Sequence, residues 1–373
     1  MSRVAKTLPS GQTTTTKKDV AKTGKVAKAN KKAAVEKTGN PEKKIENIDA
    51  SAIVADFDNV AKLFDDLREA IDKVVFGQSN VIENSITTIL AGGHALLVGV
   101  PGLAKTRLVE TLGTVLGLDE KRIQFTPDLM PSDIIGSEVM DTDKSGKRSF
   151  RYIKGPVFTQ LLMADEINRA SPRTQSALLQ AMQEYHVTVA GEQYDLPRPF
   201  HVLATQNPLE QEGTYPLPEA QLDRFLMQIN VDYPDIETER RIIIETTGQG
   251  EEKVKPVLTG EKLLAIQEMV RQMPISENVV NAILQLVRSA RPDADNNHAR
   301  KHIAWGPGPR ASQAFSLCVR ARALYQGRLA PSVDDVKALA LPILQHRMAL
   351  NFTARADGLS IGEVVNNLVK AID

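Results

Sequence analysis

The fold of this chain is decided by the stretch Leu96-Leu97-Val98-Gly99-Val100-Pro101-Gly102-Leu103-Ala104-Lys105-Thr106. An apolar strand runs into a turn of glycine and proline, then Lys-Thr, and then a helical repeat of apolar residues. Small residues let backbone N–H groups close around a polyphosphate, and the positive end of the helix faces the same anion. Lys105 would supply a point charge, and the Thr106 hydroxyl would supply a magnesium ligand. The stretch therefore predicts a nucleotide site with contacts from Gly99, Pro101, Gly102, Leu103, Ala104, Lys105 and Thr106.

One position of this loop departs from the usual pattern G-x-x-x-x-G-K-[ST]. Ala104 precedes the lysine, where glycine is usual. Because a left-handed backbone is costly for alanine, we expect Ala104 to have near right-handed helical dihedrals. On the loop alone, a chance turn of glycine and lysine is the alternative.

Length and charge indicate two folded domains behind a basic head. The chain has 373 residues, enough for two sizeable cores, and its 46 basic and 46 acidic residues cancel. Residues 1–49 carry 12 basic and 5 acidic residues with almost no large apolar side chains, which predicts a disordered head. A solvated tail is the simplest interpretation, and weak attachment to nucleic acid or another anionic surface is the alternative.

Redox and targeting signals favour a cytoplasmic protein. Cys318 is the only cysteine, so an intrachain disulfide is impossible. No apolar run approaches the roughly 20 residues that span a bilayer, and the head resembles neither a secretion signal nor a transit peptide. The histidines and this cysteine show no metal-ligand spacing, so magnesium that travels with a nucleotide is the only metal expected.

The hydrophobic pattern predicts an α/β domain followed by an all-helical one. Short apolar runs that predict buried strands occur at 95–98, 161–164, 201–204 and 225–231. Because these runs alternate with helical patterns, we expect a P-loop core with a mostly parallel sheet covered by helices. This core would extend over residues 50–232, and a separate all-helical domain would follow over residues 233–373.

Two hairpins are expected inside the first domain. Their strands are predicted at 138–140 and 150–153, and at 187–190 and 194–196, with turn-forming residues between each pair. They are either simple edge ribbons or loops that contact a substrate.

Acidic and amide side chains follow two of the predicted strands. Asp165 and Glu166 end one apolar run, and Asn207 follows the next. Because the carboxyl ends of parallel strands meet at the ligand crevice, Asp165 can hold magnesium, Glu166 can polarise a water, and Asn207 can orient that water. A helix cap and a plain turn are the alternatives. Gly77 and Gln78 would line an adenine pocket or form a helix-entry turn.

Several segments in the same order resemble the MoxR family of AAA+ ATPases. They are Gly99-Val100-Pro101-Gly102-Leu103-Ala104-Lys105-Thr106, Phe125-Thr126-Pro127-Asp128, Asp165-Glu166-Ile167-Asn168-Arg169-Ala170, Ala204-Thr205-Gln206-Asn207-Pro208 and Gly213-Thr214-Tyr215-Pro216-Leu217-Pro218-Glu219-Ala220-Gln221-Leu222-Asp223-Arg224-Phe225. The similarity extends from about Ile53 to the C-terminus, and alanine before the loop lysine fits this family. The ordered set is far more specific than any single motif.

The resemblance implies a ring of ATPase subunits, a hexamer, with ATP and Mg²⁺ bound at each subunit boundary. The matching positions are Walker A at Lys105 and Thr106, Walker B at Asp165 and Glu166, sensor 1 at Asn207, the arginine finger at Arg224 and sensor 2 at Arg310. Arg224 would reach the neighbouring subunit's γ-phosphate, whereas Arg310, on the lid, would contact the nucleotide of its own subunit. The resemblance also implies a chaperone-like role on a client protein, often with a partner that has a von Willebrand factor A domain.

Two functions of other classes are the alternatives. A nucleotide-gated assembly scaffold without significant turnover would need neither Glu166 nor Arg224. A nucleic-acid motor could use the basic head and the hairpins. Aromatic residues make up only 5% of the chain, so stacking platforms for single strands are not evident and nucleic acid is the least favoured partner.

Overall fold

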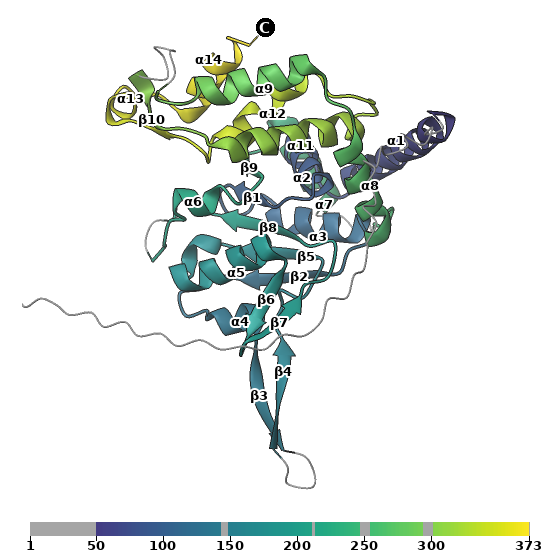
Figure 1. Ribbon diagram of the computed structural model, residues 1–373, viewed down its shortest axis with the longest axis vertical. Coiled ribbons are helices and arrows are strands. Elements are labelled where there is room, and N and C mark those ends of the chain that lie inside the picture. Colours follow the sequence, from purple (N-terminus) through teal and green to yellow (C-terminus); the bar gives the residue numbers. More distant parts are fainter. Residues whose placement is uncertain (1–49, 143–147, 211–212, 247–253, 294–300, 373) are drawn as a thin grey trace, which may run out of the picture. The chain divides into compact units, whose positions relative to one another are not determined.

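A computed structural model describes residues 50–142, 148–210, 213–246, 254–293 and 301–372. The predicted disordered head, residues 1–49, and the tip of the first hairpin, residues 143–147, lie outside the described residues. The strands are β1 Ala95–Val98, β2 Glu120–Gln124, β3 Gly136–Thr142, β4 Arg148–Lys154, β5 Leu161–Asp165, β6 His186–Val189, β7 Glu192–Asp195, β8 His201–Gln206, β9 Met227–Asn230, β10 Ile303–Trp305 and β11 Ala349–Leu350 (Figure 1). The helices are α1 Ala50–Asp72, α2 Ser79–Leu90, α3 Lys105–Val115, α4 Pro131–Ile135, η1 Ile167–Arg169, α5 Pro172–Glu184, α6 Glu219–Leu222, α7 Ile236–Thr246, α8 Gly260–Gln272, α9 Glu277–Ser289, α11 Pro309–Tyr325, α12 Val333–Leu344, α13 Phe352–Ala356 and α14 Ile361–Val369.

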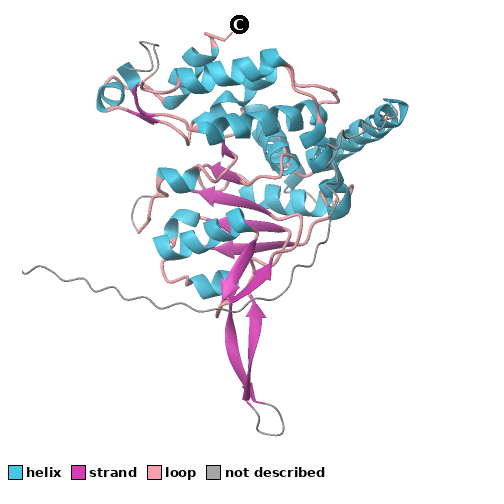
Figure 2. Ribbon diagram, in the orientation of Figure 1, coloured by secondary structure: helices cyan, strands magenta, loops and turns pink. Residues whose placement is uncertain are grey.

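Five strands form one parallel sheet in the order β2-β5-β8-β1-β9 (Figure 2). Four of them lie where the apolar runs predict strands. The edge strand β2 was not predicted, because its sequence EKRIQ buries only Ile123. The sheet is doubly wound, so the carboxyl ends of β1, β5 and β8 lie side by side at one edge.

Successive side chains of each central strand point to opposite faces of the sheet, and helices cover both faces. Leu97 and Leu203 belong to a cluster that includes the apolar side of α3. Leu96 and Ala204 belong to a second cluster, with Leu178 of α5. This alternation between two buried faces explains why the strands are apolar throughout, and it confirms the predicted fold class.

Beyond β9 the described chain is helical, apart from one short ribbon. Helices α8, α9, α11, α12 and α14 pack around residues such as Leu286, Phe315 and Leu339, in the cluster that also covers one face of the sheet. Strands β10 and β11 pair antiparallel. This ribbon was not predicted, because strands of three and two residues are too short to show alternation. None of the described helices is long and apolar enough to cross a bilayer.

Both predicted hairpins are present, as β3–β4 and β6–β7. Figure 1 shows β3–β4 extending away from the sheet. Met140 and Phe150 pair across this ribbon, and both are largely exposed. At its base, the centroid of the Tyr152 ring lies 4.2 Å from the centroid of the Tyr194 ring in the β6–β7 ribbon.

Candidate functional site

The predicted site residues gather at the carboxyl ends of β1, β5 and β8. A cavity of about 450 Å³ opens there, and its lining residues are Pro101, Gly102, Ala104, Lys105, Thr106, Arg107, Asp165, Glu166, Thr205 and Asn207. Eight of these ten residues were predicted from sequence, and Arg107 and Thr205 were not. We call this space the P-loop cavity.

Two glycines of the loop are required by its backbone. A Cβ atom on Gly99 would lie 2.5 Å from the Val231 carbonyl oxygen, so no larger residue fits beside the end of β9. Gly102 has φ +84°, in the region that favours glycine. Leu103 is buried in the core, so only its backbone can face a ligand, and its carbonyl accepts a hydrogen bond from Gln78 Nε2 at 3.2 Å.

The expectation for Ala104 is wrong. Its dihedrals are φ 55° and ψ 22°, in the left-handed region. Ala104 is the N-cap residue from which the chain turns into α3, and it is exposed to solvent. The left-handed turn therefore costs only the local backbone energy of alanine, about 1–2 kcal/mol.

Lys105 lies folded over the loop. Its Nζ donates hydrogen bonds to the carbonyl oxygens of Gly99 and Val100, both at 2.7 Å. Burial lowers the pKa of Lys105, and the nearby carboxylates Asp165 and Glu166 act in the opposite direction. The two carbonyl oxygens therefore hold the ammonium group against the loop, beside the cavity that Lys105 lines.

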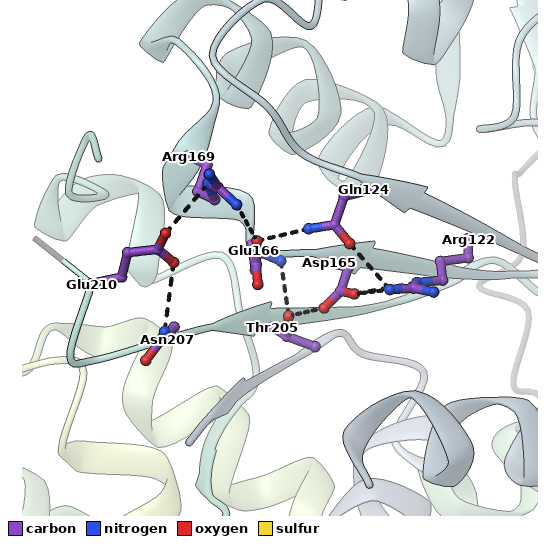
Figure 3. A network of polar contacts seen from close by, with 8 residues as sticks. All are labelled: Arg122, Gln124, Asp165, Glu166, Arg169, Thr205, Asn207 and Glu210. Carbon is purple, nitrogen blue, oxygen red and sulfur yellow. Dashed lines mark hydrogen bonds and ion pairs between the residues drawn. The ribbon is translucent and has the colours of Figure 1, made fainter. Parts of the chain in front are cut away.

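Asp165 is buried and held on both carboxylate oxygens (Figure 3). Its Oδ1 accepts from the Thr205 hydroxyl at 2.5 Å, and its Oδ2 accepts from the Arg122 guanidinium at 2.5 Å. Arg122 lies on β2, the strand that was not predicted. Once β2 is recognised, the spacing of Arg122 and Gln124 places both on the same face of that strand.

Glu166 follows with φ 54°, so the chain turns sharply at the end of β5. Its backbone N–H donates to the Thr205 hydroxyl at 2.8 Å, and its Oε2 accepts from Gln124 at 2.7 Å and from Arg169 at 3.0 Å. Thr205 thus holds both members of the acidic pair. Sequence reasoning assigned no role to Thr205, Gln124 or Arg169, although Thr205 and Arg169 lie inside the quoted motifs.

Asn207 lies at the end of β8 and faces the same network (Figure 3). Its Nδ2 is 3.5 Å from Glu210 Oε2, and its Oδ1 accepts from the Leu209 backbone N–H at 3.1 Å. Arg169 is 3.7 Å from Glu210 as well as bonded to Glu166. The Asn207 amide is therefore connected to Glu166 through the ion pair of Glu210 and Arg169.

Gly77 and Gln78 line a second cavity of about 600 Å³, with Tyr233 and Pro234 beyond β9 and Leu341 of α12 among its walls. The bond from Gln78 to the Leu103 carbonyl connects this cavity to the loop. Polar residues such as Asn80 and Asn230 also line it, so the walls combine apolar surface with hydrogen-bonding groups. We call this space the lid cavity.

Arg224 and Arg310 do not line the P-loop cavity; they line a third one of about 290 Å³. Arg224 donates to the Leu179 carbonyl at 2.7 Å, and Arg310 is 3.5 Å from Asp223 Oδ2. Arg310 was expected to contact the nucleotide of its own chain. In the structure it lies beside Arg224 instead, away from the nucleotide loop. The reason is that α11 begins at Pro309 and its first turn faces the carboxylate of Asp223.

Comparisons with known proteins agree with this geometry. A model of the ATPase family associated with various cellular activities (AAA) matches residues 94–227, and a model of the AAA lid domain matches residues 296–368. A crystal structure of a candidate ATPase from Cytophaga hutchinsonii has a TM-score of 0.80 and 37% identity, covering 87% of this chain and 98% of that one.

Curated relatives cover most of the chain. Chaperone MoxR1 of Mycobacterium tuberculosis is 41% identical over 81% of this chain and 80% of its own length. The uncharacterized protein YeaC of Bacillus subtilis is 38% identical over 82% of this chain and 92% of its own length. Protein MoxR of Paracoccus denitrificans is 31% identical over 77% of this chain and 89% of its own length. With its parallel five-stranded core, helical lid and ordered motifs, the chain belongs to the MoxR family of AAA+ ATPases.

Proposed function

We propose that this protein hydrolyses ATP in an assembly of several copies and uses the turnover to remodel a client protein. One observation carries the proposal. The groups that bind phosphate and activate water share the P-loop cavity, whereas Arg224 and Arg310 line a different cavity of the same chain. An assembly that apposes the two cavities of neighbouring copies would complete each site.

The P-loop cavity suits a magnesium nucleotide. Thr106 and Asp165 both line it, and hydroxyl and carboxylate oxygens are the ligands that Mg²⁺ prefers. These two residues would hold the ion, directly or through water, and bound Mg²⁺ would neutralise charge on the β- and γ-phosphates. Lys105 would bind the phosphates, with the backbone of the loop around them. The lid cavity, with Gly77 and Gln78, would take the adenine.

Glu166 would activate the attacking water. Its carboxylate opens into the P-loop cavity and is held by hydrogen bonds from Gln124 and Arg169. Asn207 lines the same cavity and would orient that water. The transferred phosphoryl group is loose and highly charged, so positioning and positive charge matter more than covalent chemistry.

The arginines would come from the neighbouring copy. An arginine finger is worth about a thousand-fold to a hundred-thousand-fold in rate. Because Arg224 and Arg310 line one cavity, we expect both to reach the neighbour's nucleotide together, rather than Arg310 acting in its own subunit. A hexameric ring is the arrangement that the family implies.

The client is proposed to be a protein. The M. tuberculosis relative, Chaperone MoxR1, is named as a chaperone. The β3–β4 ribbon exposes Met140 and Phe150, which could contact an unfolded segment, and a partner with a von Willebrand factor A domain is one candidate.

Steady-state phosphate release over a series of protein concentrations tests the proposal. Turnover per subunit should rise with concentration as copies assemble. The Glu166→Gln variant should bind ATP and release no phosphate. Absence of turnover in the wild-type protein at every concentration, with ATP-dependent assembly intact, would instead establish the scaffold function.

A further inference from the structure

A buried arginine of the lid grips the turn that carries Arg224. Arg347 is only 2% exposed. It donates from Nε to Asp223 Oδ1 at 2.8 Å, from one terminal nitrogen to the Phe225 carbonyl at 2.7 Å, and from the other to the Leu226 carbonyl at 3.1 Å. A further bond to the Ile343 carbonyl, at 2.7 Å, connects it to the last turn of α12, which ends at Leu344.

These partners lie on both sides of Arg224. Burial lowers the pKa of Arg347, while its bond to Asp223 acts in the opposite direction. A buried guanidinium is costly unless its donors are matched, and here four of its acceptor atoms belong to residues 223–226, including the Asp223 carbonyl at 3.4 Å. His346 adds a bond from its Nε2 to the Phe225 carbonyl at 3.0 Å. The lid thus determines the path of the backbone on either side of the candidate finger.

Asp223 connects the two arginines that would act on the neighbour. Its Oδ1 accepts from Arg347, and its Oδ2 is 3.5 Å from Arg310. Asp223 directly precedes Arg224 in the chain. The Asp223 carboxylate therefore contacts two arginines of the lid, Arg310 and Arg347, and is adjacent to Arg224 in the chain.

The same lid segment also borders the lid cavity. Gln345 lines that cavity, donates to the Gln228 carbonyl at 2.7 Å, and accepts from Asn230 at 3.0 Å. Residues 345–347 therefore extend from the cavity proposed for adenine to the turn that carries Arg224.

We propose that Arg347, acting through Asp223, is a positioning residue that sets the place of Arg224 for the site of the neighbouring copy. The proposal rests on the function proposed above. A misplacement of about 1 Å at a reacting centre can cost about a hundred-fold in rate. Loss of the Arg347–Asp223 pair should therefore lower kcat in the neighbour's site while leaving each subunit's own ATP binding intact.

The test uses Asp223→Asn, which keeps the size of the side chain, and Arg347→Lys, which keeps its charge. Arg347→Met would remove all the hydrogen bonds of this buried guanidinium at once and risks misfolding. Asp357→Asn, an exposed carboxylate of the lid, is the matched control. We expect about a hundred-fold lower kcat for the first two variants, with ATP affinity unchanged. Wild-type turnover in both would overturn the proposal.

Mixed assemblies show where the effect occurs. Asp223→Asn subunits are mixed with Glu166→Gln subunits, each nearly inactive alone. The mixture should regain turnover, because an intact P-loop cavity then faces an intact finger. Arg224→Ala mixed with Glu166→Gln is the reference. If turnover recovers in the reference mixture but not in the mixture with Asp223→Asn, the positioning role is refuted and the proposed function stands. If turnover does not recover in the reference mixture, the proposed function is refuted as well.

Discussion

Two buried histidines at the base of the sheet should make the fold sensitive to acid. His94 precedes β1, and His201 begins β8. His94 Nδ1 accepts from the Val202 backbone N–H at 2.9 Å and its Nε2 lies 3.1 Å from the Met182 carbonyl, while His201 Nε2 lies 3.0 Å from the amide nitrogen of Gln267 in the lid helix α8. These partners fit only neutral rings.

The size of the effect follows from linkage. Burial lowers the pKa of His94 from 6.5 to about 3 and that of His201 from 6.5 to about 4. Below 6.5 the unfolded chain binds protons that the folded chain does not, so the stability is complete above that pH and is lost as the pH falls. At about pH 5 each histidine should lower the free energy of unfolding by about 2 kcal/mol.

The assay is urea unfolding at about pH 7.5 and about pH 5, for the wild type and for His201→Asn. The Glu120 carboxyl, whose pKa burial raises to about 7, changes stability in the opposite direction, but it cancels in the difference between the two proteins. That difference should change by about 2 kcal/mol between the two pH values. Thr188→Asn, at an exposed position of β6 without a titratable group, is the control and should show no such change. A difference that is independent of pH would refute the reasoning.

Three further substitutions have expected outcomes. Glu166→Gln should retain ATP in a filter-binding assay and stop phosphate release; turnover at the wild-type rate would remove Glu166 from its role. Ala104→Gly should raise the free energy of unfolding in urea by about 1 kcal/mol, because the left-handed backbone no longer carries a Cβ, and a loss of stability would contradict this. Asp335→Ala should lower stability by about 3–5 kcal/mol, because Arg322 and Arg328 both lose a fully buried partner; a melting temperature unchanged from wild type would argue against it.

Much of the fold follows from sequence because the core strands are buried on both faces. The runs at 161–164 and 201–204 contain only apolar residues except His201, and such short runs between helical patterns predict parallel strands. The P-loop is equally local. Its turn, lysine and helix are consecutive, so the nucleotide site at Lys105 and Thr106 could be placed without knowledge of tertiary contacts.

The parts that sequence did not predict depend on packing between distant segments. Strand β2 reads as a polar segment because it lies at the sheet edge, so Arg122 and its bond to Asp165 were not expected. Arg310 was assigned to its own subunit's nucleotide, but the lid's position relative to Asp223 decides where it lies. Ala104 shows the limit of a backbone rule, since an exposed alanine tolerates a left-handed turn.

The rate of ATP hydrolysis by Arg224→Ala shows whether the arginine of one copy acts in the nucleotide site of the next. Arg173→Ala, on an exposed arginine of α5, is the matched control. At a concentration where the wild type is assembled, Arg224→Ala should lose about a thousand-fold or more of its kcat while binding ATP and assembling normally, and Arg173→Ala should keep its rate. Hydrolysis by assembled Arg224→Ala at the wild-type rate would contradict the account.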